Sequence, residues 1–196
     1  MPIPFRDADE IEELGAAGYL KLESSSSASA VRGALFLINA RGEPLEFTYN
    51  RLETPNTFLW RQNDVSRHSV RKLTVSLLAT CPKVPRFILC LADDIYHELF
   101  CNEVLLSVPV CRIASPLKTT AHSALESQET LESPEPVHLF WFPGKPADES
   151  IEQRLLNRLV AGGLLLEPFE RILVGIREVY DGGGTDARRG QSDQST

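Results

Sequence analysis

The sequence predicts an α/β protein with a mixed sheet, in which an antiparallel three-strand N-terminal half continues into parallel strands flanked by helices. Three observations lead to this fold class. Strand-like segments crowd the first 50 residues, an amphipathic helix pattern separates them from a continuous apolar strand, and two further helix patterns follow near the end of the chain. A chain of 196 residues suits one domain with appended segments.

The N-terminal half begins with an acidic arm over residues 1–17. Three strands are expected after it, over residues 18–23, 32–39 and 44–50. The third strand alternates apolar with polar side chains, so one of its faces meets a core and the other meets water. Because only a short turn at Gly42 separates the second strand from the third, these two strands are expected to form an antiparallel hairpin.

A helix is expected over residues 65–81, where apolar side chains recur three and four positions apart. Residues 87–91 are continuously apolar, which is typical of a central strand that is covered on both faces. Asp93 and Asp94 follow the C-terminal end of this strand. They are expected to open a short helix that ends at Leu99.

The C-terminal half combines strands and helices with one insertion. Residues 114–136 are rich in Ser, Thr, Pro and Glu and poor in large apolar side chains, so we expect a flexible insertion there. A capping box from Ser150 to Gln153 starts the first of two helices. The polar tail over residues 181–196 is expected to be disordered, which leaves residues 18–180 as the domain. The other elements expected here are strands over 104–113 and 137–142 and helices over 150–161 and 167–180.

Composition limits the classes of protein to which the chain can belong. The first residues lack the basic and apolar regions of a secretion signal, and no uncharged apolar stretch approaches the roughly 20 residues of a membrane-spanning helix. The four cysteines are spaced for neither a zinc site nor a compact disulfide framework. We therefore expect a soluble, cytoplasmic protein with free thiols, no membrane partner and no cofactor.

The distribution of charge is uneven. The formal net charge of −7 argues against a protein wholly dedicated to nucleic acid. Residues 51–86 nevertheless hold seven Lys or Arg against two acidic residues. A nucleic-acid-binding module would use the basic segment 61–86, although a solvated outer helix face explains the same side chains. The candidates for contact with phosphate are Arg61, Arg67, Arg71, Lys72 and Arg86.

The order of the elements resembles that of the ribonuclease H-like fold. Two short strings add to the resemblance. Residues 90–96, Cys-Leu-Ala-Asp-Asp-Ile-Tyr, are similar to the family's strand that ends in an Asp with a Tyr three positions later. Residues 140–145, Phe-Trp-Phe-Pro-Gly-Lys, are similar to the strand and loop that precede the family's last catalytic helix.

This resemblance implies chemistry with three or four carboxylates that hold two divalent ions. Glu23 matches the acid of the family's first strand approximately, and Asp93 matches the acid that ends the fourth strand. These two are the candidate metal ligands, and Asp94 joins them as a candidate catalytic acid. Two further acids are missing, because the first helix offers no Glu in its first turns and the later helix has Leu155 or Leu156 where an Asp is expected.

Two local questions stay open at this point. Asp93 and Asp94 either bind a metal ion at the end of a central strand or belong to a helix that Asp94 caps. The aromatic side chains of Phe140, Trp141 and Phe142 either fill the core or form an interface with a partner.

The sequence favours a non-catalytic accessory or interaction protein that acts within a larger intracellular assembly and binds another protein. This prediction follows from the shortage of acids. The first alternative is a nuclease dependent on Mg²⁺ or Mn²⁺, which would use Glu23, Asp93 and Asp94 with Glu149 or Glu152 as a further ligand. The second alternative is a module that binds nucleic acid through its basic segment.

Overall fold

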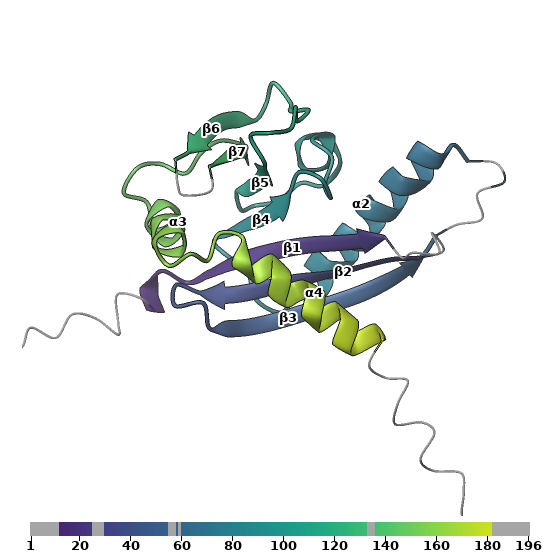
Figure 1. Ribbon diagram of the computed structural model, residues 1–196, viewed down its shortest axis with the longest axis horizontal. Helices are drawn as coiled ribbons and strands as arrows, with labels where there is room; N and C mark the ends of the chain where they lie inside the picture. Colours follow the sequence, from purple (N-terminus) through teal and green to yellow (C-terminus); the bar gives the residue numbers. More distant parts are fainter. Residues whose placement is uncertain (1–11, 25–29, 55–57, 59, 133–135, 182–196) are drawn as a thin grey trace, which may run out of the picture.

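The computed structural model describes residues 12–24, 30–54, 58, 60–132 and 136–181. A seven-stranded sheet runs through this part of the chain in the order β3-β2-β1-β4-β5-β7-β6 (Figure 1). Its strands are β1 (Ala16–Ser24), β2 (Ala30–Asn39), β3 (Pro44–Glu53), β4 (Phe87–Leu91), β5 (Val110–Ala114), β6 (Ser127–Leu131) and β7 (Val137–Phe142).

The sheet is mixed, as the sequence predicts. β1, β2 and β3 pair antiparallel, and β4 then pairs parallel with both β1 and β5. The β2–β3 turn is set by Asn39, whose side-chain oxygen accepts hydrogen bonds from the backbone N–H groups of Arg41 and Glu43. Gly42 in this turn has a φ of +81°, a conformation that costs glycine little. The predicted fold class is therefore confirmed.

Helices cover both faces of the sheet (Figure 1). One face is covered by α3 (Ile151–Ala161) and α4 (Glu167–Tyr180), and the other by α2 (Gln62–Thr80) and a short π-helical turn, η2 (Leu99–Glu103). Half of the predicted capping box is present, since the Ser150 hydroxyl accepts a hydrogen bond from the Gln153 backbone N–H at 3.1 Å. The Gln153 side chain instead donates to Asn157, and the Ser150 backbone N–H donates to the carbonyl oxygen of Ala147. The core is thus split by the sheet into two apolar layers.

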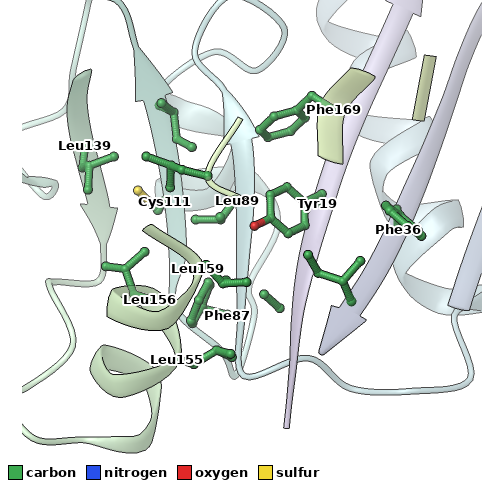
Figure 2. Close-up of a cluster of buried hydrophobic side chains, with 14 of the residues drawn as sticks. Tyr19, Phe36, Phe87, Leu89, Cys111, Leu139, Leu155, Leu156, Leu159 and Phe169 are labelled. Atoms are coloured by element: carbon green, nitrogen blue, oxygen red, sulfur yellow. The ribbon is translucent and has the colours of Figure 1, made fainter. Parts of the chain in front are cut away.

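The layer beneath α3 and α4 contains the larger side chains (Figure 2). Tyr19 of β1 lies edge-on to Phe169 of α4, with ring centroids 5.3 Å apart. Its hydroxyl donates a hydrogen bond of 2.6 Å to the carbonyl oxygen of Leu164, in the loop between α3 and α4. A buried tyrosine therefore fixes this loop against the centre of the sheet.

The three aromatic side chains of β7 divide between the two layers. Phe140 and Trp141 are buried on opposite faces, and the partly buried Phe142 packs on the same face as Phe140. The core interpretation therefore holds for Phe140 and Trp141.

None of the helices in the described part of the chain combines the length and apolar character that crossing a bilayer requires.

Three elements differ from the sequence prediction. β5 begins at Val110 instead of residue 104, and no helix opens at Asp94, because the chain turns there and becomes helical only near η2. β6 lies inside the segment 114–136, where a flexible insertion without regular structure was expected. Of the predicted terminal segments, residues 1–11 of the acidic arm and residues 182–196 of the tail lie outside the described residues.

Candidate functional site

β1, β3 and β4 all end at one edge of the sheet, which we call the carboxyl edge. The chain leaves β1 toward β2 and leaves β4 toward β5, so the two connections diverge at this edge. Open α/β sheets place their ligand sites in such a crevice. The last parallel pair is Leu20 with Cys90, which puts Lys21 at the mouth of the crevice.

Lys21 and Asp94 meet in this crevice. Lys21 Nζ lies 2.8 Å from Asp94 Oδ2, and each side chain is only 14% exposed. A backbone hydrogen bond from Leu22 also stabilises the Asp94 carboxylate. Burial is the largest influence and raises the pKa of Asp94, while the bond and charge of Lys21 lower it in part. Asp94 is thus the partner of a lysine and caps no helix.

Asp93 has a different partner. Its carboxylate lies 2.7 Å from the ammonium of Lys118, and both side chains are more than half exposed. The Asp93 side chain also lines two pockets. The first, of about 580 Å³, is apolar and includes Ile113 and Leu166, whereas the second, of about 270 Å³, is polar and includes His97 and Lys118.

Glu23 lies two residues after Lys21 on β1, and its side chain is on the same face of the sheet. It lies directly opposite Arg32 in the antiparallel register, where side chains on one face are close neighbours. Arg32 in turn donates to Asp181 at 2.9 Å and lies over the ring of Tyr180. Each of the three candidate acids therefore has a different cation beside it, and among the described residues the three form no cluster that could hold a metal ion.

Of the two acids considered as further ligands, Glu152 is remote from the crevice, and Glu149 lies just before α3. Glu152 lines a pocket with Arg86 and Pro109 at the opposite edge of the sheet, where β4 and β5 begin. Leu155 and Leu156 are buried in the core. Among the described residues, no three His, Cys, Asp or Glu side chains gather so that they could hold a metal ion. The side chains present therefore do not fit a centre of two divalent ions.

The basic side chains of α2 have acidic neighbours. Arg67 lies 3.3 Å from Glu98 and 3.1 Å from Glu103, and its guanidinium lies over the ring of Tyr96. Arg71 approaches Glu103 at 3.8 Å. These contacts join the first half of α2 to the segment that follows β4. Both arginines are about half exposed, so they retain access to solvent.

The remaining basic candidates separate into two groups. Arg61, which precedes α2, and Lys72 on its outer face are exposed and have no ion-pair partner among the described residues. Arg86 precedes β4 and lies beside Gly15, at the edge opposite the crevice. Because the 19 residues of α2 span about 28 Å, Arg86 cannot share one phosphate contact region with Arg61.

Two aromatic side chains are exposed just before α2. Phe58 is 90% exposed and Trp60 is 44% exposed, with the Trp60 ring 5.2 Å from that of His68. The chain reaches them from the end of β3, and β3 ends at the carboxyl edge together with β1. Exposed aromatic and basic side chains therefore lie toward the same edge of the sheet as Lys21, at the start of the helix that covers the opposite face.

Lys21 and Lys118 were not among the site residues predicted from the sequence. A signal for Lys21 was present, since it is a charged residue in an otherwise apolar strand interior, on the same face as Tyr19 and Glu23. No comparable signal marks Lys118, because it lies in a polar loop that only the fold brings to Asp93.

Comparison with known proteins gives a consistent fold. No protein-family model and no curated protein sequence matches the chain. Among solved structures, the Endonuclease V of Bacillus subtilis superposes with a TM-score of 0.55 and 13% identity, over 88% of this chain and 84% of that chain. The Endonuclease V of Streptomyces avermitilis superposes with a TM-score of 0.51 and 13% identity, over 86% of this chain and 82% of that chain.

The fold is therefore ribonuclease H-like, as the element order and the two short strings suggested. The prediction of a non-catalytic accessory or interaction protein is contradicted by this likeness, because the two solved structures named above are those of endonucleases V. The expected protein partner gains no support from the described residues.

Proposed function

We propose that the protein acts on nucleic acid, and that the bound strand lies along the carboxyl edge of the sheet. The supporting observation is that basic and exposed aromatic side chains gather at this edge. Lys21 lies at the crevice, Lys118 contacts Asp93 after the end of β4, and Phe58, Trp60 and Arg61 lie at the start of α2. Stacking of bases on aromatic rings beside a basic groove is a general way to bind single strands.

Cleavage of the phosphodiester backbone is the activity that the likeness to the two endonucleases V favours. In nucleases of this fold the resemblance implies two divalent ions. The described carboxylates do not fit such a centre, because no three His, Cys, Asp or Glu side chains gather among the described residues, and Asp94 and Asp93 each contact a lysine. Binding and cleavage are therefore separate parts of the proposal, and each needs its own measurement.

The test uses the full chain with labelled single-stranded and double-stranded DNA and RNA. Fluorescence anisotropy measures binding, and denaturing gels measure cleavage, in EDTA, in Mg²⁺ and in Mn²⁺. We expect binding that weakens steeply as salt is raised, because phosphate contacts release counterions. Trp60→Ala should weaken binding to a single strand by about tenfold, the loss expected for one stacked base.

Tyr49→Ala is the matched control, since Tyr49 is 48% exposed but lies in the middle of β3. Circular dichroism confirms that each variant is folded. Equal losses in the two variants would argue against stacking at the carboxyl edge. A folded wild-type chain that binds none of the four nucleic acids would refute the proposed function.

A further inference from the structure

The crevice between β1 and β4 holds an ammonium group, that of Lys21, in contact with the Asp94 carboxylate. We propose that Lys21 takes the place of a divalent ion, and that its ammonium binds a phosphodiester oxygen of nucleic acid without metal. This inference rests on the proposed function. It follows from the mismatch between a metal centre and the side chains that are present.

The charges around Asp93 and Asp94 are balanced. Uncompensated carboxylates repel a phosphodiester, so an acidic crevice accepts it only when cations are added. Here Asp94 is compensated by Lys21 at 2.8 Å and Asp93 by Lys118 at 2.7 Å. These two acids and two ammonium groups sum to zero charge. A phosphate therefore meets no net repulsion there.

The Lys21 ammonium group has hydrogen-bond donors that Asp94 does not use. A lysine ammonium has three N–H donors, and the contact with Asp94 uses one of them. Asp94 is itself held by a backbone hydrogen bond from Leu22, so it fixes the position of the ammonium. The Lys21 side chain is 14% exposed, so part of it remains in contact with solvent. Asp94 thus acts as a positioning residue for Lys21.

Lys21 competes with any divalent cation for the Asp94 carboxylate. A divalent cation that bound Asp94 would have to displace an ammonium already in contact with the same carboxylate. Such an ion would also find too few oxygen ligands, because no group of three suitable side chains exists among the described residues. Lys21 and a metal ion therefore exclude each other at Asp94.

A second ammonium extends the site beyond the crevice. Lys118 is 63% exposed and its ion pair with Asp93 is exposed too, so the pair is weak and Lys118 can turn toward a phosphate. It lines the polar pocket of about 270 Å³ together with His97, Thr119 and Thr120. The hydroxyl and ammonium groups there are suited to the phosphate next to the one at Lys21.

The experiment measures nucleic-acid binding by the full chain in EDTA and in Mg²⁺. We expect dissociation constants that agree within about twofold, since metal contributes nothing to the contact. The double variant Lys21→Met with Asp94→Asn removes both charges, so no unpaired buried charge remains. It should weaken binding by about fivefold to tenfold, the effect of one lost phosphate contact. Lys21→Arg should retain most of the affinity.

Arg171→Met with Glu167→Gln is the matched control. This pair, 3.0 Å apart on α4, lies near the β2–β3 turn at the opposite edge, and its removal should leave binding unchanged. Binding of Mn²⁺ alone is followed by electron paramagnetic resonance. Stoichiometric Mn²⁺ binding that Asp94→Asn abolishes would overturn the inference.

The outcomes also separate the inference from the proposed function. Nucleic-acid binding that requires Mg²⁺, or that persists unchanged in the folded Lys21→Met and Asp94→Asn double variant, would refute the role of Lys21 alone. Failure of the folded wild-type chain to bind any nucleic acid would remove both proposals together.

Discussion

Arg112 and Glu126 form an ion pair that is almost fully buried, with side chains 3% and 2% exposed. Arg112 Nε lies 2.7 Å from Glu126 Oε1, and a second bond of 2.9 Å joins Nη2 to Oε2. The guanidinium also donates to the carbonyl oxygens of Ile95 and Ala121. One arginine of β5 therefore connects the segment after β4 with the loop that leads into β6.

Glu126→Ala should destabilise the fold by about 3 to 5 kcal/mol, because it leaves the Arg112 guanidinium buried without its counter-charge. Chemical denaturation followed by circular dichroism measures the change in the free energy of unfolding. Arg112→Met combined with Glu126→Leu should recover most of the loss, since no unpaired charge remains. Lys118→Ala, which breaks an exposed pair, should cost less than about 1 kcal/mol. Similar losses in the exposed and the buried pair would contradict this account.

Tyr19→Phe should lower stability at neutral pH by about 1 kcal/mol, because the Leu164 carbonyl loses its hydrogen bond. A second effect depends on pH. Burial raises the pKa of Tyr19 well above the ordinary value of 10. The unfolded chain therefore releases this proton at a lower pH than the folded chain does. The stabilisation is complete below pH 10 and declines as pH rises toward the folded-state pKa.

The measurement is the free energy of unfolding of wild type and Tyr19→Phe across the alkaline range. The wild-type curve should fall more steeply above pH 10, by at most about 1.4 kcal/mol per pH unit for one proton. Parallel curves would show that Tyr19 is not the group responsible. The buried thiols of Cys90 and Cys111 also have raised pKa values, and both variants share them, so their contribution cancels.

The sequence predicted those elements whose side chains carry a clear period. α3 and α4 repeat apolar residues at helical spacing, and the apolar run in β4 is unambiguous. β6 could not be predicted, because Ser-Gln-Glu-Thr-Leu has no apolar alternation. It pairs with β7 and follows directly after Glu126, which Arg112 anchors.

The candidate site was predicted less well than the fold. Asp93 and Asp94 were placed correctly at the end of the central strand, but their partners were not foreseen. Lys21 meets Asp94 across 73 positions of sequence, and only the register of β1 against β4 brings them together. Glu23 was matched to an acidic position by its place in the strand, whereas its neighbour in the sheet is Arg32. Spacing along the chain holds no information about such contacts.

Gly175→Ala should destabilise the protein, although alanine is the better helix former by about 1 kcal/mol. A Cβ atom at this position of α4 would lie 2.6 Å from Cζ of Phe47, whose ring packs between those of Phe36 and Tyr49. Overpacking of this kind costs about 1 to 3 kcal/mol, so the net change should be a loss.

Thermal and chemical unfolding measure the effect of Gly175→Ala, and Gly144→Ala is the control. A Cβ at Gly144 would meet no atom within 4 Å, so that variant should match wild type. Phe47→Leu in the Gly175→Ala background should restore part of the stability by making room. Equal stability of the two alanine variants would show that the Phe47 ring moves aside at no cost.

A binding assay with the variants Arg61→Ala and Arg86→Ala should show which of the two edges of the sheet contacts nucleic acid. Both side chains are exposed, but Arg61 stands beside Trp60 at the carboxyl edge and Arg86 lies at the opposite edge. If a nucleic-acid strand follows the carboxyl edge, Arg61→Ala should weaken binding by about threefold to tenfold. It should also reduce the slope of log affinity against log salt by about one, whereas Arg86→Ala should change neither quantity. A loss of affinity in Arg86→Ala that equals or exceeds the loss in Arg61→Ala would place the strand elsewhere.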